Sequence, residues 1–259
     1  MSNSVSLSLN TPDMQSLQTA SHFQFSTVGL DNLTELQYTL ATLVCDLSGS
    51  VTPFKTEIER CASTIVESLA KSPRVENLLF RVVGFNAQIS EVHGFRLLRE
   101  INPNEYNNTL NPSGNTALYD AILSSIEATN RLARMLVDQE SEVNAVIYVL
   151  TDGMDNASSG TTLAIKNAIN RAMKDECLQS IAVILIGIGY QDANVKTYLD
   201  RVNSEANLSQ FVDLTELFTK ASPATALAKI AGFVSKSFST TSQVLQSGNS
   251  NASSSLLTI

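Results

Sequence analysis

The sequence predicts an α/β fold in which a mostly parallel, doubly wound sheet carries helices on both faces. Short apolar runs of strand length alternate with longer segments whose apolar residues recur at helical spacing. Two of these runs, 143–150 and 180–188, are apolar almost throughout, which is typical of strands covered on both faces. We therefore expect six strands in the order 3-2-1-4-5-6, with strand 3 as an antiparallel edge strand.

The predicted strands are 40–45, 78–85, 89–98, 143–150, 180–188 and 210–214. The loop between the second and third strands, Asn86-Ala87-Gln88, is short enough for a hairpin, so the third strand should run antiparallel to the second. The predicted helices are 53–70, 116–138, 161–174, 193–203 and 223–238. The last of them should begin at a Ser222-Pro223 cap and bury a stripe of Leu227, Ile230, Ala231, Val234 and Phe238.

Three segments of different composition follow one another along the chain. Residues 1–36 are polar and rich in Ser and Thr, with alternating stretches at 4–9 and 23–28 that predict an edge strand or a hairpin. Residues 37–240 hold the alternating strands and helices and should form the main domain. Residues 241–259 are rich in Ser and Asn, and we expect a disordered tail.

Composition disfavours some classes of function and indicates where in the cell the chain is expected. A net charge of −8 argues against binding to a nucleic-acid backbone, which needs a basic face. The three cysteines, Cys45, Cys61 and Cys177, are widely spaced and fall in apolar patterns, which favours buried free thiols in a reducing compartment. Neither a signal peptide nor a run of transmembrane length is visible, so we expect a cytoplasmic chain that is not attached to a membrane.

Polar side chains follow two of the predicted strands at the point where each strand ends. Asp46, Ser48 and Ser50 come directly after the first strand, Asp152 follows the fourth, and Thr116 precedes a helix. In the predicted order, the first and fourth strands are neighbours, and a crevice opens between their carboxyl ends. The topology should therefore bring the two carboxylates together, with oxygen ligands of the kind that Mg²⁺, Mn²⁺ or Ca²⁺ prefers.

Each of these residues also has a purely structural interpretation. Asp46 fits a helix cap with Ser48 and Ser50 as turn formers, Thr116 fits the cap of helix 116–138, and Asp152 followed by glycine fits a turn. Their joint occurrence favours the metal site. Other polar residues nearby are expected to support the loops or to have no role in the site: Asp155, Asn156, Tyr119 and Asp120.

The pattern Asp46-x-Ser48-x-Ser50, then Thr116, then Asp152 resembles the metal-ion-dependent adhesion site of von Willebrand factor type A domains, across about residues 35–240. The resemblance implies a Rossmann-like fold and a bound Mg²⁺, or Mn²⁺ or Ca²⁺. Ser48, Ser50 and Thr116 would contact the metal directly, and the two aspartates directly or through water. The resemblance further implies that a partner's Asp or Glu completes the coordination.

The chain also resembles bacterial intracellular proteins built on a single von Willebrand factor type A domain. That resemblance implies a metal-dependent adaptor in a stress or defence system, with an ATPase, kinase or phosphatase of the same system as partner. A structural protein of a virion or filament is the alternative. A phosphatase of the haloacid-dehalogenase kind would use Asp46 as nucleophile, but Ser48 stands where that family carries its second aspartate. We therefore expect no enzyme and assign no catalytic residue.

Overall fold

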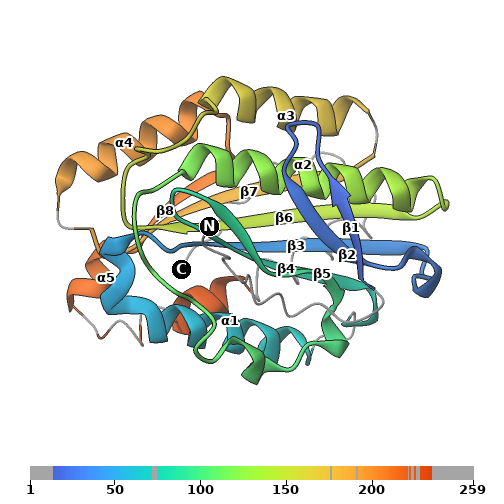
Figure 1. The fold of residues 1–259 in the computed structure, drawn as a ribbon, viewed down its shortest axis with the longest axis horizontal. Helices are drawn as coiled ribbons and strands as arrows, with labels where there is room; N and C mark the ends of the chain where they lie inside the picture. Colours follow the sequence, from blue (N-terminus) through green and yellow to red (C-terminus); the bar gives the residue numbers. More distant parts are fainter. Residues whose placement is uncertain are drawn as a thin grey trace, which may run out of the picture.

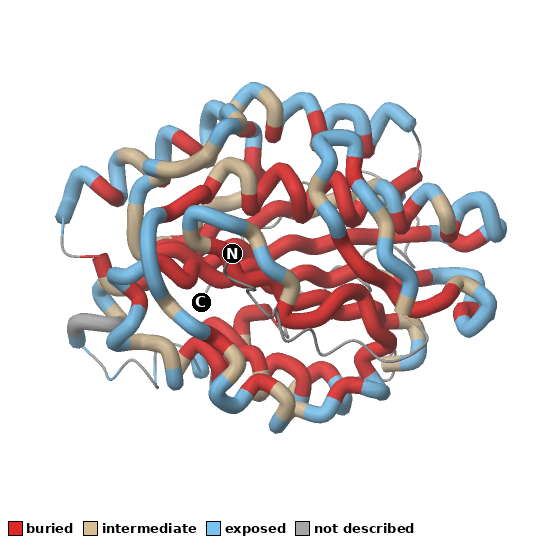
Figure 2. Tube along the Cα trace, in the orientation of Figure 1, coloured by how far each residue is buried: buried red, intermediate tan, exposed pale blue. Residues whose placement is uncertain are grey.

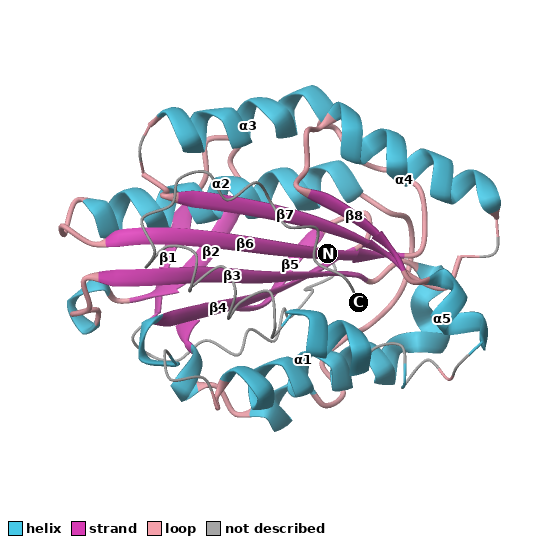
Figure 3. Ribbon diagram, turned by 180° about the vertical axis from the view of Figure 1, so that it is seen from behind, coloured by secondary structure: helices cyan, strands magenta, loops and turns pink. Residues whose placement is uncertain are grey.

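The computed structural model describes residues 14–71, 75–175, 177–190, 192–220, 222, 225 and 228–234, except for the side chains of residues 218 and 219. One mixed sheet of eight strands, in the order β1-β2-β5-β4-β3-β6-β7-β8, runs through this part of the chain. Helices cover both faces of the sheet (Figure 1, and from behind in Figure 3). Its strands are β1 Met14–Gln18, β2 Gln24–Val28, β3 Gln37–Asp46, β4 Leu78–Phe85, β5 Ile89–Leu97, β6 Glu142–Thr151, β7 Ser180–Gly187 and β8 Gln210–Asp213.

The helices divide between the two faces. Helices α2 (Leu118–Val137), α3 (Thr162–Lys174) and α4 (Ala193–Glu205) share one apolar cluster with the sheet, and lie above it in Figure 1. Helix α1 (Lys55–Leu69) packs on the opposite face together with the helical segment 228–234, and α5 (Thr215–Lys220) follows β8. The strands between these layers are buried along most of their length (Figure 2), as the apolar runs predicted.

The predicted α/β class and the order of the six central strands are confirmed. Strands β5, β4, β3, β6, β7 and β8 occupy the positions 3-2-1-4-5-6. Strand β5 pairs antiparallel with β4, as the short connection indicated. Strand β3 lies between β4 and β6 and is parallel to both, so Cys45 pairs with Leu150 and Asp46 with Phe85 at the carboxyl end of the sheet.

The expectations of six strands and of β5 as an edge strand were wrong. Strand β2 continues the sheet beyond β5, with Thr27 beside Phe95 in parallel register, and β1 pairs antiparallel with β2. The close approach depends on Gly94, because a Cβ there would lie 2.1 Å from the Ser26 carbonyl oxygen. The Glu91 carboxylate accepts hydrogen bonds from the Ser26 backbone N–H at 2.9 Å and hydroxyl at 2.6 Å.

The first alternating stretch, 4–9, and the tail, 241–259, lie outside the described residues. The second stretch, 23–28, contains β2 and belongs to a β1–β2 hairpin. Within the part of the chain that the structure describes, no helix is long and apolar enough to cross a membrane.

The described part of the last helix, 228–234, buries the residues of the predicted apolar stripe that it contains. Ile230, Ala231 and Val234 are all at most 1% exposed, and the Tyr148 hydroxyl of β6 donates to the Val234 carbonyl oxygen at 3.4 Å. The Ser222 hydroxyl accepts from the Thr225 N–H at 3.2 Å, as an N-cap does. Leu227, Phe238 and Pro223 lie outside the described residues.

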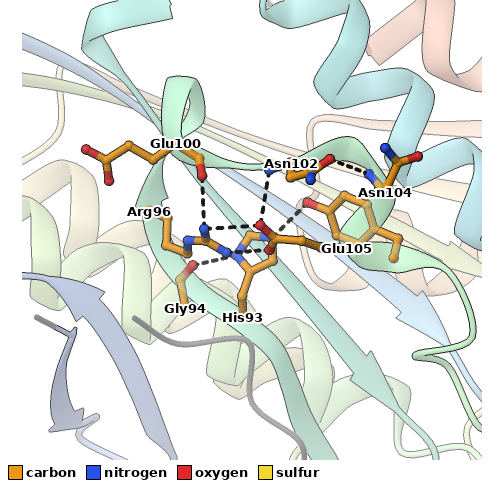
Figure 4. Close-up of polar contacts among 8 residues, drawn as sticks. His93, Gly94, Arg96, Glu100, Asn102, Asn104 and Glu105 are labelled. Atoms are coloured by element: carbon orange, nitrogen blue, oxygen red, sulfur yellow. Dashed lines mark hydrogen bonds and ion pairs between the residues drawn. The ribbon is translucent and has the colours of Figure 1, made fainter. Parts of the chain in front are cut away.

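A buried polar network fixes the segment that follows β5 (Figure 4). Arg96 donates to the Glu105 carboxylate at 2.6 Å and to the Glu100 carbonyl oxygen at 3.0 Å. His93 Nδ1 lies 2.8 Å from the Gly94 carbonyl oxygen, so this nitrogen carries the proton and Nε2 accepts from the Tyr106 hydroxyl. Burial lowers the pKa of His93 to about 4, which keeps the ring neutral. The network anchors the start of the long loop that leads to Thr116.

Candidate metal centre

Three loops meet at the carboxyl ends of β3 and β6. The loop after β3 is joined to the segment before α2 by two backbone hydrogen bonds, Gly49 N–H to the Gly114 carbonyl oxygen at 3.1 Å and Ser113 N–H to the Leu47 carbonyl oxygen at 2.7 Å. The loop after β6 joins the same segment through the Asn156 N–H, which donates to the Thr116 carbonyl oxygen at 2.9 Å. Gly114 takes a positive φ of 74°, which favours glycine at this turn.

Asp46 ends β3 and is only 1% exposed. One carboxylate oxygen, Oδ1, accepts from the Ser48 backbone N–H at 2.8 Å. The other, Oδ2, accepts from the Thr151 hydroxyl at the end of β6, at 2.6 Å. These two bonds hold the carboxylate in one orientation between the neighbouring strands.

A chain of hydroxyl groups connects this loop to Asp152. The Ser50 hydroxyl donates to Asp152 Oδ1 at 2.9 Å. The Ser48 and Ser50 hydroxyl oxygens lie 3.0 Å apart. Because the one hydroxyl proton of Ser50 goes to Asp152, the Ser48 hydroxyl is the donor in that contact. Four of the five predicted ligands therefore form one connected polar cluster.

Thr116, the fifth predicted ligand, is not hydrogen-bonded to the other four among the described contacts, and its backbone is held by the loop after β6. Its N–H donates to the Asn156 side-chain oxygen at 2.8 Å, and its carbonyl oxygen accepts from the Asn156 N–H. Helix α2 begins at Leu118 with Ala117 at the cap position, so the interpretation of Thr116 as the helix cap was wrong. Its side chain is 5% exposed and is free of a capping role.

Both carboxylates have raised pKa values. Burial raises the pKa of Asp46, in spite of the hydrogen bonds from Thr151 and Ser48. Burial, and then the charge of Asp46, raise the pKa of Asp152 to about 6. Among the described residues, no ion pair engages either aspartate. Two carboxylates and several hydroxyls without a cationic side chain fit a small divalent cation, which would neutralise the repulsion.

The chemical nature of the ligand atoms indicates which metals the site suits. Within the described ranges, no group of three or more His, Cys, Asp or Glu side chains is placed to hold a metal. The cluster at Asp46 and Asp152 consists of carboxylate and hydroxyl oxygens, which suits Mg²⁺ or Mn²⁺ and not zinc or copper.

Asp155 and Asn156 were expected to support the loops, whereas the roles of Thr151, Tyr119 and Asp120 were missed. Thr151 orients Asp46, and Asn156 holds the backbone of Thr116, as described above. Asp155 accepts from the Tyr119 N–H at 3.1 Å, and Asp120 accepts from the Ser159 and Gly160 N–H groups at 2.9 and 2.8 Å. The one sequence signal for these roles was closeness to the predicted ligands along the chain. Thr151 directly precedes Asp152, and Tyr119 and Asp120 lie in the first turn of α2, shortly after Thr116.

The chain belongs to the von Willebrand factor type A domain family, whose model matches residues 42–246. The PilB minor pilin from Streptococcus sanguinis has a similar fold, with 16% identity and a TM-score of 0.54 over 80% of this chain. This chain spans 62% of the PilB chain. A von Willebrand factor type A protein from Catenulispora acidiphila has 14% identity and a TM-score of 0.51, over 82% of this chain and 44% of that one.

The pilus adhesin SpaC from Lactobacillus rhamnosus GG, in its open conformation, is also similar in fold, with 13% identity and a TM-score of 0.52. The similarity covers 88% of this chain and 32% of SpaC. A search of curated protein sequences finds no match. At these identities the likeness shows a shared fold.

Proposed function

We propose that this chain is a non-enzymatic, metal-dependent protein-binding module that captures an Asp or Glu side chain of a partner protein. The observation that carries the proposal is the convergence of Asp46, Ser48, Ser50 and Asp152 in one hydrogen-bonded cluster, with Thr116 held by Asn156 in the adjoining loop. These are the five positions at which the sequence resembles a metal-ion-dependent adhesion site.

Each residue has a role that follows from its surroundings. Asp46 is buried and oriented by Thr151, so it supplies a fixed negative charge at the base of the site. Ser48 and Ser50 offer hydroxyl oxygens from one loop, and Asp152 supplies the second charge from the neighbouring strand. A divalent cation held here would offer an open coordination position to a carboxylate of the partner.

The surface beside the cluster offers a second kind of contact. Met154 lies in the loop after β6, two residues from Asp152, and its side chain is 38% exposed. An unbranched apolar side chain adapts to varied partner surfaces. Met154 would therefore add apolar contact next to the captured carboxylate.

We assign the partner to an ATPase, kinase or phosphatase that acts in the same bacterial stress or defence system, and the chain to the cytoplasm. The buried free thiols of Cys45, Cys61 and Cys177 support a reducing compartment. Cell fractionation tests the location, and cross-linking in cells followed by mass spectrometry tests the partner.

The metal is tested by calorimetry with Mn²⁺. We expect one site in the wild-type chain and loss of binding in Asp46→Ala. Asp138→Ala removes an exposed carboxylate just after α2 and serves as the control that keeps the site. Unchanged Mn²⁺ binding in Asp46→Ala would overturn the assignment.

The capture of an acidic side chain is tested with any partner recovered by cross-linking. Chelation and Asp/Glu→Ala at the partner's contact should each abolish the complex. If the complex survives chelation, its interface lies elsewhere. Size-exclusion chromatography with and without Mg²⁺ separates the adaptor from the assembly alternative, because metal-bridged assembly would shift the chain itself to larger species.

A further inference from the structure

Two adjoining hollows lie between the tip of the β1–β2 hairpin and helices α2 and α3, where Figure 1 shows the hairpin reaching up to the helices. Their volumes are about 350 and 520 Å³, and both are lined by Glu127 and Arg171. We call them together the basic groove, because four cationic side chains line them, Arg131, Arg134, Arg171 and Lys174.

Tertiary contacts build the wall of the basic groove. The Glu127 carboxylate, only 6% exposed, accepts from the Ser21 backbone N–H at 2.9 Å and the Ser21 hydroxyl at 2.8 Å, which fixes the hairpin tip against α2. Arg171 lies 3.7 Å from the same carboxylate, which is too far for a hydrogen bond. The two charges form an ion pair at this distance, but the Arg171 side chain is 57% exposed and its N–H groups can still donate to a ligand.

The basic groove carries an excess of positive charge in an acidic chain. Arg134 is paired with Asp175 and Arg171 with Glu127, which is the one carboxylate among the described residues that line the groove. No ion pair of the described residues engages Arg131 or Lys174. Arg134, Arg171 and Lys174 stand in the last turns of their helices, where positive charge is favourable, but Arg131 lies a turn earlier. The chain as a whole has a net charge of −8, so the basic groove is a positively charged region on an acidic protein.

We propose that the basic groove binds an extended acidic peptide segment of a protein partner, independently of the metal centre. Guanidinium groups bind carboxylates through paired hydrogen bonds. The side-chain amides of Asn167 and Asn170 line the larger hollow and offer donors and acceptors to a peptide backbone. Among the described residues that line the two hollows none is aromatic, so these residues offer no stacking platform of the kind that single-stranded nucleic acid requires.

The basic groove is a separate site and not an extension of the metal centre. Thr116 lies just before the start of α2, whereas Arg131 lies in its second half. Thirteen residues separate Leu118 from Arg131, which corresponds to about 20 Å along the helix axis. The proposal therefore stands whether or not a cation binds at Asp46.

The test uses the full chain and a fluorescein-labelled octaglutamate peptide, with binding followed by anisotropy at low salt in the presence of EDTA. The test variant is Arg131→Glu/Lys174→Glu. The matched control is Lys166→Glu/Lys229→Glu, which makes the same change in net charge at exposed residues outside the groove. Thermal unfolding of both variants checks that the fold is retained, and the single variant Arg131→Gln gives a milder change should the double variant unfold.

We expect the octaglutamate peptide to bind the wild-type and control chains, and to bind the test variant at least about tenfold more weakly. Octaglutamine should not bind, and added salt should weaken the complex. Equal affinity for test and control variants, or no binding to the wild type, would overturn the proposal. Tighter binding of an oligothymidine than of octaglutamate would overturn the peptide assignment, and loss of binding in Asp46→Ala under EDTA would relocate the contact to the metal centre.

Discussion

The hydroxyl of Thr151 and the carboxylate of Asp46 lie 2.6 Å apart, at the ends of two neighbouring parallel strands. This hydrogen bond crosses from β6 to β3 and orients a carboxylate that is almost fully buried. Residues that hold a metal-binding side chain in place contribute to affinity although they do not touch the metal.

Thr151→Val should weaken Mn²⁺ binding by about tenfold or more, because Asp46 loses one of its two hydrogen-bond donors while valine keeps the shape of the threonine side chain. Calorimetry measures the change. Thr42→Val is the matched control, since Thr42 is a buried threonine of β3 whose hydroxyl has no hydrogen-bond partner among the described residues. An affinity of Thr151→Val equal to that of the control would show that the bond does not support the site.

Asp46→Asn should abolish metal binding without destabilising the chain in chelator. The amide can accept from the Ser48 N–H and donate to the Thr151 oxygen, whose proton can then turn to the Gly153 carbonyl oxygen at 3.4 Å. The change also removes a buried charge that opposes the ionisation of Asp152. Scanning calorimetry with EDTA should give an unchanged or higher thermal midpoint. A fall of several degrees would mean that the carboxylate of Asp46 serves mainly to hold the loop.

The same change should lower the pKa of Asp152. Because the charge of Asp46 contributes to the raised value of about 6, its removal should move the pKa back toward the ordinary value of 3.8. Titration of the Asp152 carboxyl carbon by NMR, in wild type and in Asp46→Asn, measures the shift. Identical titration curves would assign the whole effect to burial.

Metal affinity should depend on pH. Because the pKa of Asp152 is about 6 without metal, Mn²⁺ must displace a proton at lower pH, and its affinity should fall by about tenfold per pH unit below 6. The free energy of unfolding of the metal-free chain should show the opposite trend and increase as the pH falls. The folded chain holds this proton more tightly than the unfolded chain, so the stabilisation is complete below about pH 3.8 and lost as the pH rises through about 6. Calorimetry and thermal unfolding between pH 5 and 7.5 measure both trends, and a flat Mn²⁺ affinity over this range would contradict the shift.

Ile230→Ala should destabilise the domain by about 2–4 kcal/mol, because the side chain is fully buried between the last helix and the sheet and its removal leaves a cavity. For a chain of this size, the thermal midpoint should fall by about 5–15 °C. Lys229→Ala changes the exposed neighbour in the same helix and should leave the midpoint within about 2 °C of wild type. Similar midpoints for the two variants would mean that the last helix contributes little to the folded core.

The sequence by itself determined the alternation of strands and helices and the order of the six central strands. Apolar periodicity marks each element locally, and the chirality of parallel connections then leaves few arrangements of the sheet. The meeting of Asp46 and Asp152 followed from that order, because Asp46 ends β3 and Asp152 directly follows β6, its parallel neighbour.

Only the tertiary structure decided which distant residues support these elements. Strand β2 can pair with β5 because Gly94 has no side chain and because the Glu91 carboxylate binds Ser26. Glu91 and Ser26 lie far apart in the sequence. The displacement of Thr116 from the helix cap likewise depends on Asn156 in another loop. The basic groove exists because Glu127 binds the hairpin tip at Ser21. Such contacts join residues far apart in the chain, and hydrogen bonds of this kind leave no periodic pattern in the sequence from which they could be predicted.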